Sequence, residues 1–111
     1  MEIKVENVKS QMRKGYLEYC ILLIIKRKPA YVSDIVNELK EARMIVVEGT
    51  LYPLLSRLKN NGILSYQWQE SASGPPRKYY ELTETGNDFL AELENGWEEL
   101  EHAIQLLRTK Q

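Results

Sequence analysis

The chain has 111 residues, of which 43% are apolar and 28% are charged, and its formal net charge is −1. This length predicts one small domain, and no apolar run approaches the roughly 18–20 residues that a membrane span needs. The N-terminus has no apolar segment typical of a signal peptide, and a single cysteine excludes an intramolecular disulfide, so we predict a cytoplasmic protein.

The charges are distributed unevenly along the chain. Residues 1–80 hold 13 Lys and Arg against 8 Asp and Glu, whereas residues 81–111 hold 2 against 8. This asymmetry predicts a basic part that faces an anionic partner and a separate acidic helix.

The first half of the chain predicts two helices and a short strand. Residues 7–27 are apolar nearly all round in their second half, which predicts a buried helix, and Pro29 prevents its continuation. Ser33 and Asp34 are suitable caps for a second helix. Residues 44–47, of which three are β-branched, then predict a short strand.

A third helix is expected over residues 49–62, where Gly62 provides a C-terminal stop. Its apolar stripe consists of four leucines at helical spacing: Leu51, Leu54, Leu55 and Leu58. Away from the stripe lie Thr50, Tyr52, Pro53, Ser56, Arg57 and Lys59. Pro53 lacks the N–H that would bond to the carbonyl of Gly49, so we expect an irregular first turn.

A β-hairpin follows the third helix. Residues 63–69 alternate as a strand does, residues 71–76 form a cluster of turn residues, and residues 77–82 form the returning strand. Alternation places Leu64, Tyr66 and Trp68 on one face of the first strand. On the returning strand it places Tyr80 with Leu82 on the inner face and Tyr79 with Arg77 on the other. We expect the hairpin to be packed by Tyr66, Trp68 and Tyr80.

The last helix begins after Thr83, a natural N-cap, and runs close to the C-terminus. Its apolar residues repeat with heptad spacing, and we call them the heptad stripe: Leu90, Leu93, Trp97, Leu100, Ile104 and Leu107. An exposed stripe of this kind would promote aggregation, so we predict that it forms a dimer interface. Trp97 is either a plain part of that interface or, with Leu93, the lining of a pocket for a flat apolar effector.

Catalytic and metal-binding residues are scarce. His102 is the only histidine and lies among glutamates, and Cys20 is the only cysteine. Together they offer no convincing set of transition-metal ligands, and no glycine-rich phosphate loop follows a strand. We therefore predict that the protein is not an enzyme and uses neither a cofactor nor a metal.

The third helix and the hairpin have the side chains that DNA binding requires. Phosphates are bound by basic, hydroxyl and tyrosine groups, and a helix of this size fits the major groove. The predicted DNA contacts are Thr50, Tyr52, Pro53, Ser56, Arg57, Lys59, Arg77, Lys78 and Tyr79. The alternative is that the basic residues among them are ordinary solvated cations.

One pattern spans the third helix, the hairpin and the start of the last helix. It consists of Gly-Thr-Leu-Tyr-Pro at 49–53, Leu55, Arg57-Leu58, Gly62, Gly74-Pro75, Arg77-Lys78-Tyr79-Tyr80, Leu82-Thr83 and Gly86. In this order and spacing the chain resembles the PadR family of bacterial transcriptional regulators over about residues 12–107. Val46-Val47 before Glu48 departs from the family, in which a capping serine is usual, so Glu48 or the backbone has to compensate.

The resemblance implies a mainly α fold with a small β-hairpin, namely a winged helix-turn-helix with a long C-terminal dimerisation helix. It implies a homodimeric repressor of a palindromic operator, with recognition by residues 49–59 and phosphate contact by residues 77–78. A single C-terminal helix resembles the short branch of the family. Some members of that branch respond to flat hydrophobic drugs and others to phenolic acids, and nothing in the sequence selects between them.

We therefore expect residues 1–82 to form a winged helix-turn-helix DNA-binding domain and residues 83–111 to form a dimerisation helix of the same compact unit. The predicted function is that of a dimeric transcriptional regulator. It would be a repressor that a small aromatic or hydrophobic effector releases from double-stranded DNA. The alternative is a winged-helix module for protein–protein interaction that does not bind DNA, and the overall acidity favours it slightly.

Overall fold

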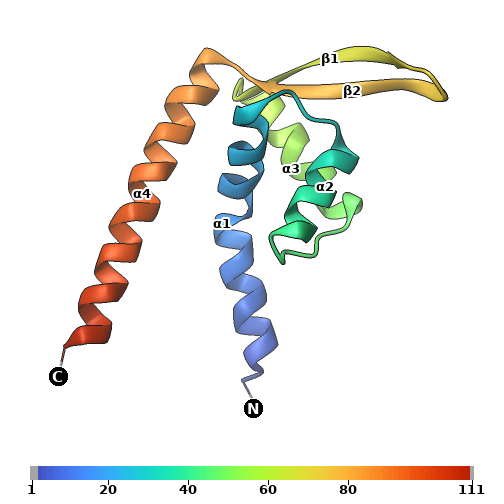
Figure 1. Cartoon of the computed structure of the whole chain (residues 1–111). Coiled ribbons are helices and arrows are strands. Elements are labelled where there is room, and N and C mark those ends of the chain that lie inside the picture. The colour runs from blue at the N-terminus through green and yellow to red at the C-terminus, as the bar shows by residue number, and fades with distance from the viewer. Residues whose placement is uncertain (1–2, 111) are drawn as a thin grey trace.

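The computed structural model describes residues 3–110, and over these residues the chain forms four helices and one antiparallel hairpin (Figure 1). The elements are α1 (Val5–Arg27), α2 (Val32–Glu41), α3 (Glu48–Asn60), β1 (Leu64–Ser71), β2 (Gly74–Leu82) and α4 (Glu84–Thr109). This arrangement confirms the predicted fold class. None of the four helices is both long enough and apolar enough to cross a membrane.

The core lies where α1, α2, α3 and the base of the hairpin meet. Its most completely buried side chains are Ile21, Leu22, Ile35, Leu39, Leu51, Leu55 and Leu64. Each such side chain stabilises the fold by about 1.5–3 kcal/mol through its removal from water. The leucine stripe of α3 is therefore its inner face, which leaves the opposite face to solvent.

The start of α2 differs from the prediction in one residue. Tyr31 is the N-cap, and its backbone N–H donates to the carboxylate of Asp34 at 3.2 Å. The hydroxyl of Ser33 instead donates to Glu48 at 3.2 Å, which joins the first turns of α2 and α3. The prediction for Asp34 thus holds, whereas Ser33 connects two helices and does not cap one.

Residues 44–47 do not form the predicted strand. They connect α2 to α3 without regular structure, and Ile45 and Val47 are exposed. The backbone that pairs with β2 on its free side is that of Ala30, which exchanges hydrogen bonds of 2.8 and 2.9 Å with Tyr80. A strand needs a neighbour for its backbone groups, and residues 44–47 pair with no other segment in the part of the chain that the structure describes.

Helix α3 continues through Pro53 without interruption. In its first turn the N–H of Thr50 donates to the carbonyl of Val47 at 3.0 Å. This bond spans three residues, as in a 3₁₀ turn, whereas an α-helical bond spans four. No side chain caps this end, and the carboxylate of Glu48 accepts from Ser33 of α2. The expected irregularity is therefore confined to the first turn.

The hairpin is longer than predicted and its turn is shorter. Ser71 pairs with Gly74, so residues 72–73 alone connect the strands. The prediction of a turn over residues 71–76 is wrong, because Pro75 and Pro76 belong to β2. Two consecutive prolines are tolerated there because the pairing shifts register opposite them, between Gln69 and Ser71, and because only one strand flanks β2 along its outer half.

Thr83 caps α4, as predicted. Its hydroxyl oxygen accepts from the N–H of Gly86 at 2.9 Å and donates to the carbonyl of Gly62 at 2.6 Å. This hydroxyl thus ties the start of α4 to the end of α3. From that junction α4 and α1 run toward the two chain termini and diverge (Figure 1).

Candidate functional site

The exposed face of α3 lies next to the hairpin. Tyr52, Pro53 and Ser56 are solvent-exposed on this face, opposite the leucine stripe. Tyr52 borders a cleft of about 250 Å³ between α2, α3 and the hairpin, whose wall includes Arg77 and Lys78 of β2. The structure therefore brings predicted contact residues of α3 and β2 onto one surface.

Arg77 is held by an aromatic residue that the sequence did not single out. Its guanidinium carbon lies 4.7 Å from the ring centroid of Tyr31, and that ring is 6.0 Å from the ring of Tyr79. Such a cation–π contact is worth about 0.5–1 kcal/mol at an exposed site. It orients the guanidinium while leaving its charge available to an anion. Tyr31 precedes a helix start, and nothing in its local sequence places it beside Arg77.

Lys78 points to the opposite face of the hairpin. Its ammonium lies 4.4 Å from the ring centroid of Tyr66 and 5.3 Å from that of Trp68. Lys59 of α3 lies 5.6 Å from the same Tyr66 ring. Over residues 3–110, no ion pair neutralises Lys59, Arg77 or Lys78. Side-chain alternation thus distributes unpaired charge over both faces of the hairpin.

Trp68 contacts the ring of Tyr66 edge-on, with centroids 6.1 Å apart, but it is 62% exposed, so the expectation that it packs the hairpin holds only in part. Tyr66 and Tyr80 do pack, with ring centroids 5.9 Å apart and Tyr80 buried. Trp68 differs from Tyr66 and Tyr80 because it lies farther from the base of the hairpin. The base of the hairpin covers the core, whereas its outer part extends beyond α2 and α3 (Figure 1).

Two predicted contact residues lie on the edge of α3 away from the hairpin. Arg57 forms an ion pair with Glu18 of α1. Thr50 borders a cleft with Arg13 of α1 and the loop before α3. Residues two apart on a helix differ in direction by about 200°, so Arg57 and Lys59 face different neighbours. The structure does not bring Arg57 together with the hairpin cations.

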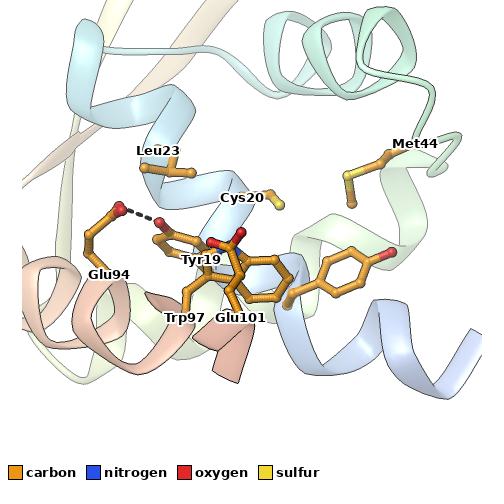
Figure 2. Close-up of a pocket in the computed structure, with 8 residues that line it drawn as sticks. Tyr19, Cys20, Leu23, Met44, Glu94, Trp97 and Glu101 are labelled. Atoms are coloured by element: carbon orange, nitrogen blue, oxygen red, sulfur yellow. Dashed lines mark hydrogen bonds between the residues drawn. The ribbon is translucent and has the colours of Figure 1, made fainter. Parts of the chain in front are cut away.

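A larger cleft of about 570 Å³ lies between α1 and α4, and Figure 2 shows its lining. Trp97 of α4 has its ring centroid 6.2 Å from those of both Tyr16 and Tyr19 of α1. The hydroxyl of Tyr19 donates to Glu94 (Figure 2). Burial and this carboxylate raise the pKa of Tyr19 to about 12, so the phenol remains a protonated donor at neutral pH. Leu93 lines a smaller adjoining cleft of about 240 Å³.

The heptad stripe divides into a covered and an uncovered part. Leu90 is 3% exposed and belongs to the core of its own chain, and Leu93 packs against that core. Leu100, Ile104 and Leu107 are exposed, the last by 72%. The prediction of Leu90 as a partner contact is therefore corrected, because its side chain is already buried within one chain. The uncovered part of the stripe starts after Trp97.

Comparisons with known proteins agree in one family. Residues 21–92 match the model of the family described as "Transcriptional regulator PadR-like family". A PadR-like transcription factor from Bacteroides fragilis is 64% identical, and the match covers 91% of this chain and 98% of that chain with a TM-score of 0.77. A PadR-like transcriptional regulator from Bacillus cereus is 33% identical, and the match covers 91% and 99% with a TM-score of 0.81.

A further solved structure shares the fold. PadR from Bacillus subtilis, in a crystal structure with operator DNA, is 24% identical and has a TM-score of 0.64. The match covers 69% of this chain and 44% of that chain. At this identity the likeness concerns the fold alone.

Proposed function

Because the chain belongs to the PadR-like family of transcriptional regulators, we propose that it is a homodimeric repressor that binds a palindromic operator in the cytoplasm. The family is one of regulators and not of enzymes. In this proposal α3 enters the major groove and the hairpin contacts the flanking backbone. A small aromatic or hydrophobic effector releases the DNA.

One observation carries the proposal: Arg77 and Lys78, which lie on the two faces of the hairpin and have no ion-pair partner within residues 3–110, both line the cleft that Tyr52 of α3 borders. Tyr52 and Ser56 on that face have hydroxyl groups that can bond to base edges or phosphates. Arg77 is oriented by Tyr31 before any ligand binds. The operator complex of the Bacillus subtilis neighbour, which has the same fold, also supports this assignment.

A gel shift against the region upstream of the protein's own gene tests the proposal. We expect specific retardation in which log K falls linearly with log salt concentration, because bound Lys and Arg release counterions from the phosphates. An unrelated duplex of equal length is the control. The absence of specific retardation, or a binding constant independent of salt, would contradict DNA recognition.

The uncovered part of the heptad stripe supports the dimer. Changing both Ile104 and Leu107 to Asp is expected to produce a monomer whose helical content is retained. Each apolar residue that a partner buries contributes about 1.5–3 kcal/mol, so losing two should raise the dissociation constant roughly a hundredfold or more. Sedimentation equilibrium measures the mass, and Gln105→Asp, on the same exposed turn, is the control. A double variant with the wild-type dimer mass would place the interface elsewhere.

In this proposal an effector releases DNA because it binds in the larger cleft, between α1 and α4. One wall is α1, which packs against α2 and the hairpin, and the other is α4, which carries the uncovered stripe. A ligand between these walls favours one relative orientation of α1 and α4. In a dimer this orientation sets the separation of the two recognition helices, so the ligand shifts the population between DNA-compatible and incompatible forms.

A further inference from the structure

The outer part of the hairpin has an exposed aromatic residue on the same face with which its base covers the core. Trp68 of β1 pairs with Lys78 of β2, and Tyr66 pairs with Tyr80. Alternation therefore places these four side chains on one face of the hairpin. Tyr66 and Tyr80 pack against the core, whereas Trp68 is 62% exposed. The face that covers the core thus continues beyond it as an open aromatic surface.

This open surface lies beside the polar face of α3. Trp68 borders the same cleft of about 250 Å³ as Tyr52 of α3, which is itself 48% exposed. Arg77 and Lys78 line that cleft as well. A single exposed apolar residue is normal on a protein surface, whereas a patch of large rings is typical of an interaction site. Rings and unpaired cations together match an anionic partner that also has apolar groups.

The ammonium of Lys78 lies between the two rings of β1. It is 4.4 Å from the ring centroid of Tyr66 and 5.3 Å from that of Trp68, and these rings meet edge-on with centroids 6.1 Å apart. Within residues 3–110 no carboxylate pairs with Lys78. Cation–π contacts orient an ammonium without occupying it as an ion pair does. A phosphate bound by Lys78 would therefore lie beside the exposed indole.

From this arrangement we propose that Trp68 is a DNA contact, whose indole packs against the deoxyribose next to the phosphate that Lys78 binds. The inference rests on the proposed function and adds an uncharged contact to the two cations of the hairpin. The sugar carbons offer apolar surface to the ring, and the indole N–H can donate to a phosphate oxygen. Since sugar and phosphate are the same at every step of the duplex, this contact adds affinity without base preference.

The indole N–H signals of the wild-type protein provide a direct test. The chain has two tryptophans, so a ¹⁵N–¹H spectrum contains two indole signals, and the one missing in Trp68→Phe belongs to Trp68. On saturation with an operator duplex we expect the Trp68 signal to shift and its exchange with water to slow severalfold. Trp97, in the cleft between α1 and α4, is the internal control. Equal exchange of the Trp68 N–H in free and bound protein would overturn the proposal.

Gel shifts of variants separate this contact from the charged ones. Trp68→Ala should weaken operator binding at least about tenfold, because large aromatic residues covered in an interface contribute that much. Its salt slope should match that of the wild type, since no charge is lost, whereas Lys78→Ala should lower the slope of a dimer by about 2. Trp68→Phe, which keeps a ring without the N–H, should fall between. Gln67→Ala, an exposed neighbour on the opposite face of β1, is the control.

An unrelated duplex at low salt tests the assignment to the backbone. Trp68→Ala should weaken binding to it by the same factor as binding to the operator, and a loss confined to the operator would instead indicate base contact and overturn the sugar assignment. Operator binding by Trp68→Ala at wild-type strength would overturn the inference and leave the proposed function intact. A wild-type protein that never retards the operator would contradict the proposed function and this inference with it.

Discussion

Replacing Arg77 and Lys78 together with alanine is expected to weaken operator binding on the order of a hundredfold at physiological salt. Both side chains contact aromatic rings at the surface and none of the core, so the fold and the dimer should persist. If each cation neutralises one phosphate, a dimer loses four contacts. The slope of log K against log salt should then fall by roughly 3–4, which a gel-shift salt series measures.

For the single variant Arg77→Ala, Arg57 offers a control with the same change of charge. Arg57→Ala removes a guanidinium that pairs with Glu18 of α1, on the edge of α3 away from the hairpin. We expect it to reduce binding and salt slope much less than Arg77→Ala. Circular dichroism should be unchanged in both variants. If the Arg77 and Lys78 double variant bound DNA like the wild type, the rival interpretation of a protein-interaction module would be favoured.

Gly86→Ala is expected to destabilise the protein by about 3 kcal/mol or more, an effect typical of severe steric conflict with the core. A Cβ at Gly86 would lie 2.1 Å from the carbonyl oxygen of Ile63 and 3.0 Å from its carbonyl carbon. These are backbone atoms, and the same carbonyl accepts the N–H of Thr83 at 3.2 Å. Relief of the clash therefore has to disturb the junction between α3, the hairpin and α4.

Gly96→Ala on the same helix provides the matched comparison. No atom lies within 4 Å of a Cβ built there, and alanine is favoured over glycine in a helix by about 1 kcal/mol. We expect Gly96→Ala to be neutral or stabilising. Urea unfolding at one protein concentration measures both variants, because dimerisation makes stability depend on concentration. A midpoint for Gly86→Ala equal to that of the wild type would contradict the packing of α4 against Ile63.

Local patterns in the sequence predicted several features correctly. The leucine stripe of α3 is its buried face, Thr83 caps α4, and Tyr80 is buried while Tyr79 is more exposed. Helical spacing, capping chemistry and strand alternation depend on residues within a few positions of one another. Such features therefore follow from the chain itself.

The wrong predictions concern segments whose structure depends on a distant partner. Three of residues 44–47 have β-branched side chains, but no other segment of the described chain pairs with them. Pro75 and Pro76 suggested a turn, but pairing with β1 extends the strand through them. Trp68 lies on the same face as Tyr66 and contacts its ring, but only Tyr66 packs against the core and Trp68 is left exposed. In each case the local sequence pattern is present, but it does not show which distant segment lies beside it in the fold.

The sequence by itself determined the order of the four helices and the hairpin, the family, and the presence of basic residues in the hairpin that follows a polar helix face, because each is encoded in residues close together in the chain. The tertiary structure decided which neighbour each face meets. It turned Arg57 toward Glu18, buried Leu90 while leaving Leu107 uncovered, and placed the carboxylates of Glu94 and Glu101 against aromatic residues of α1. Periodicity identifies the residues that share a face, but only the packing of helix against helix fixes what lies opposite.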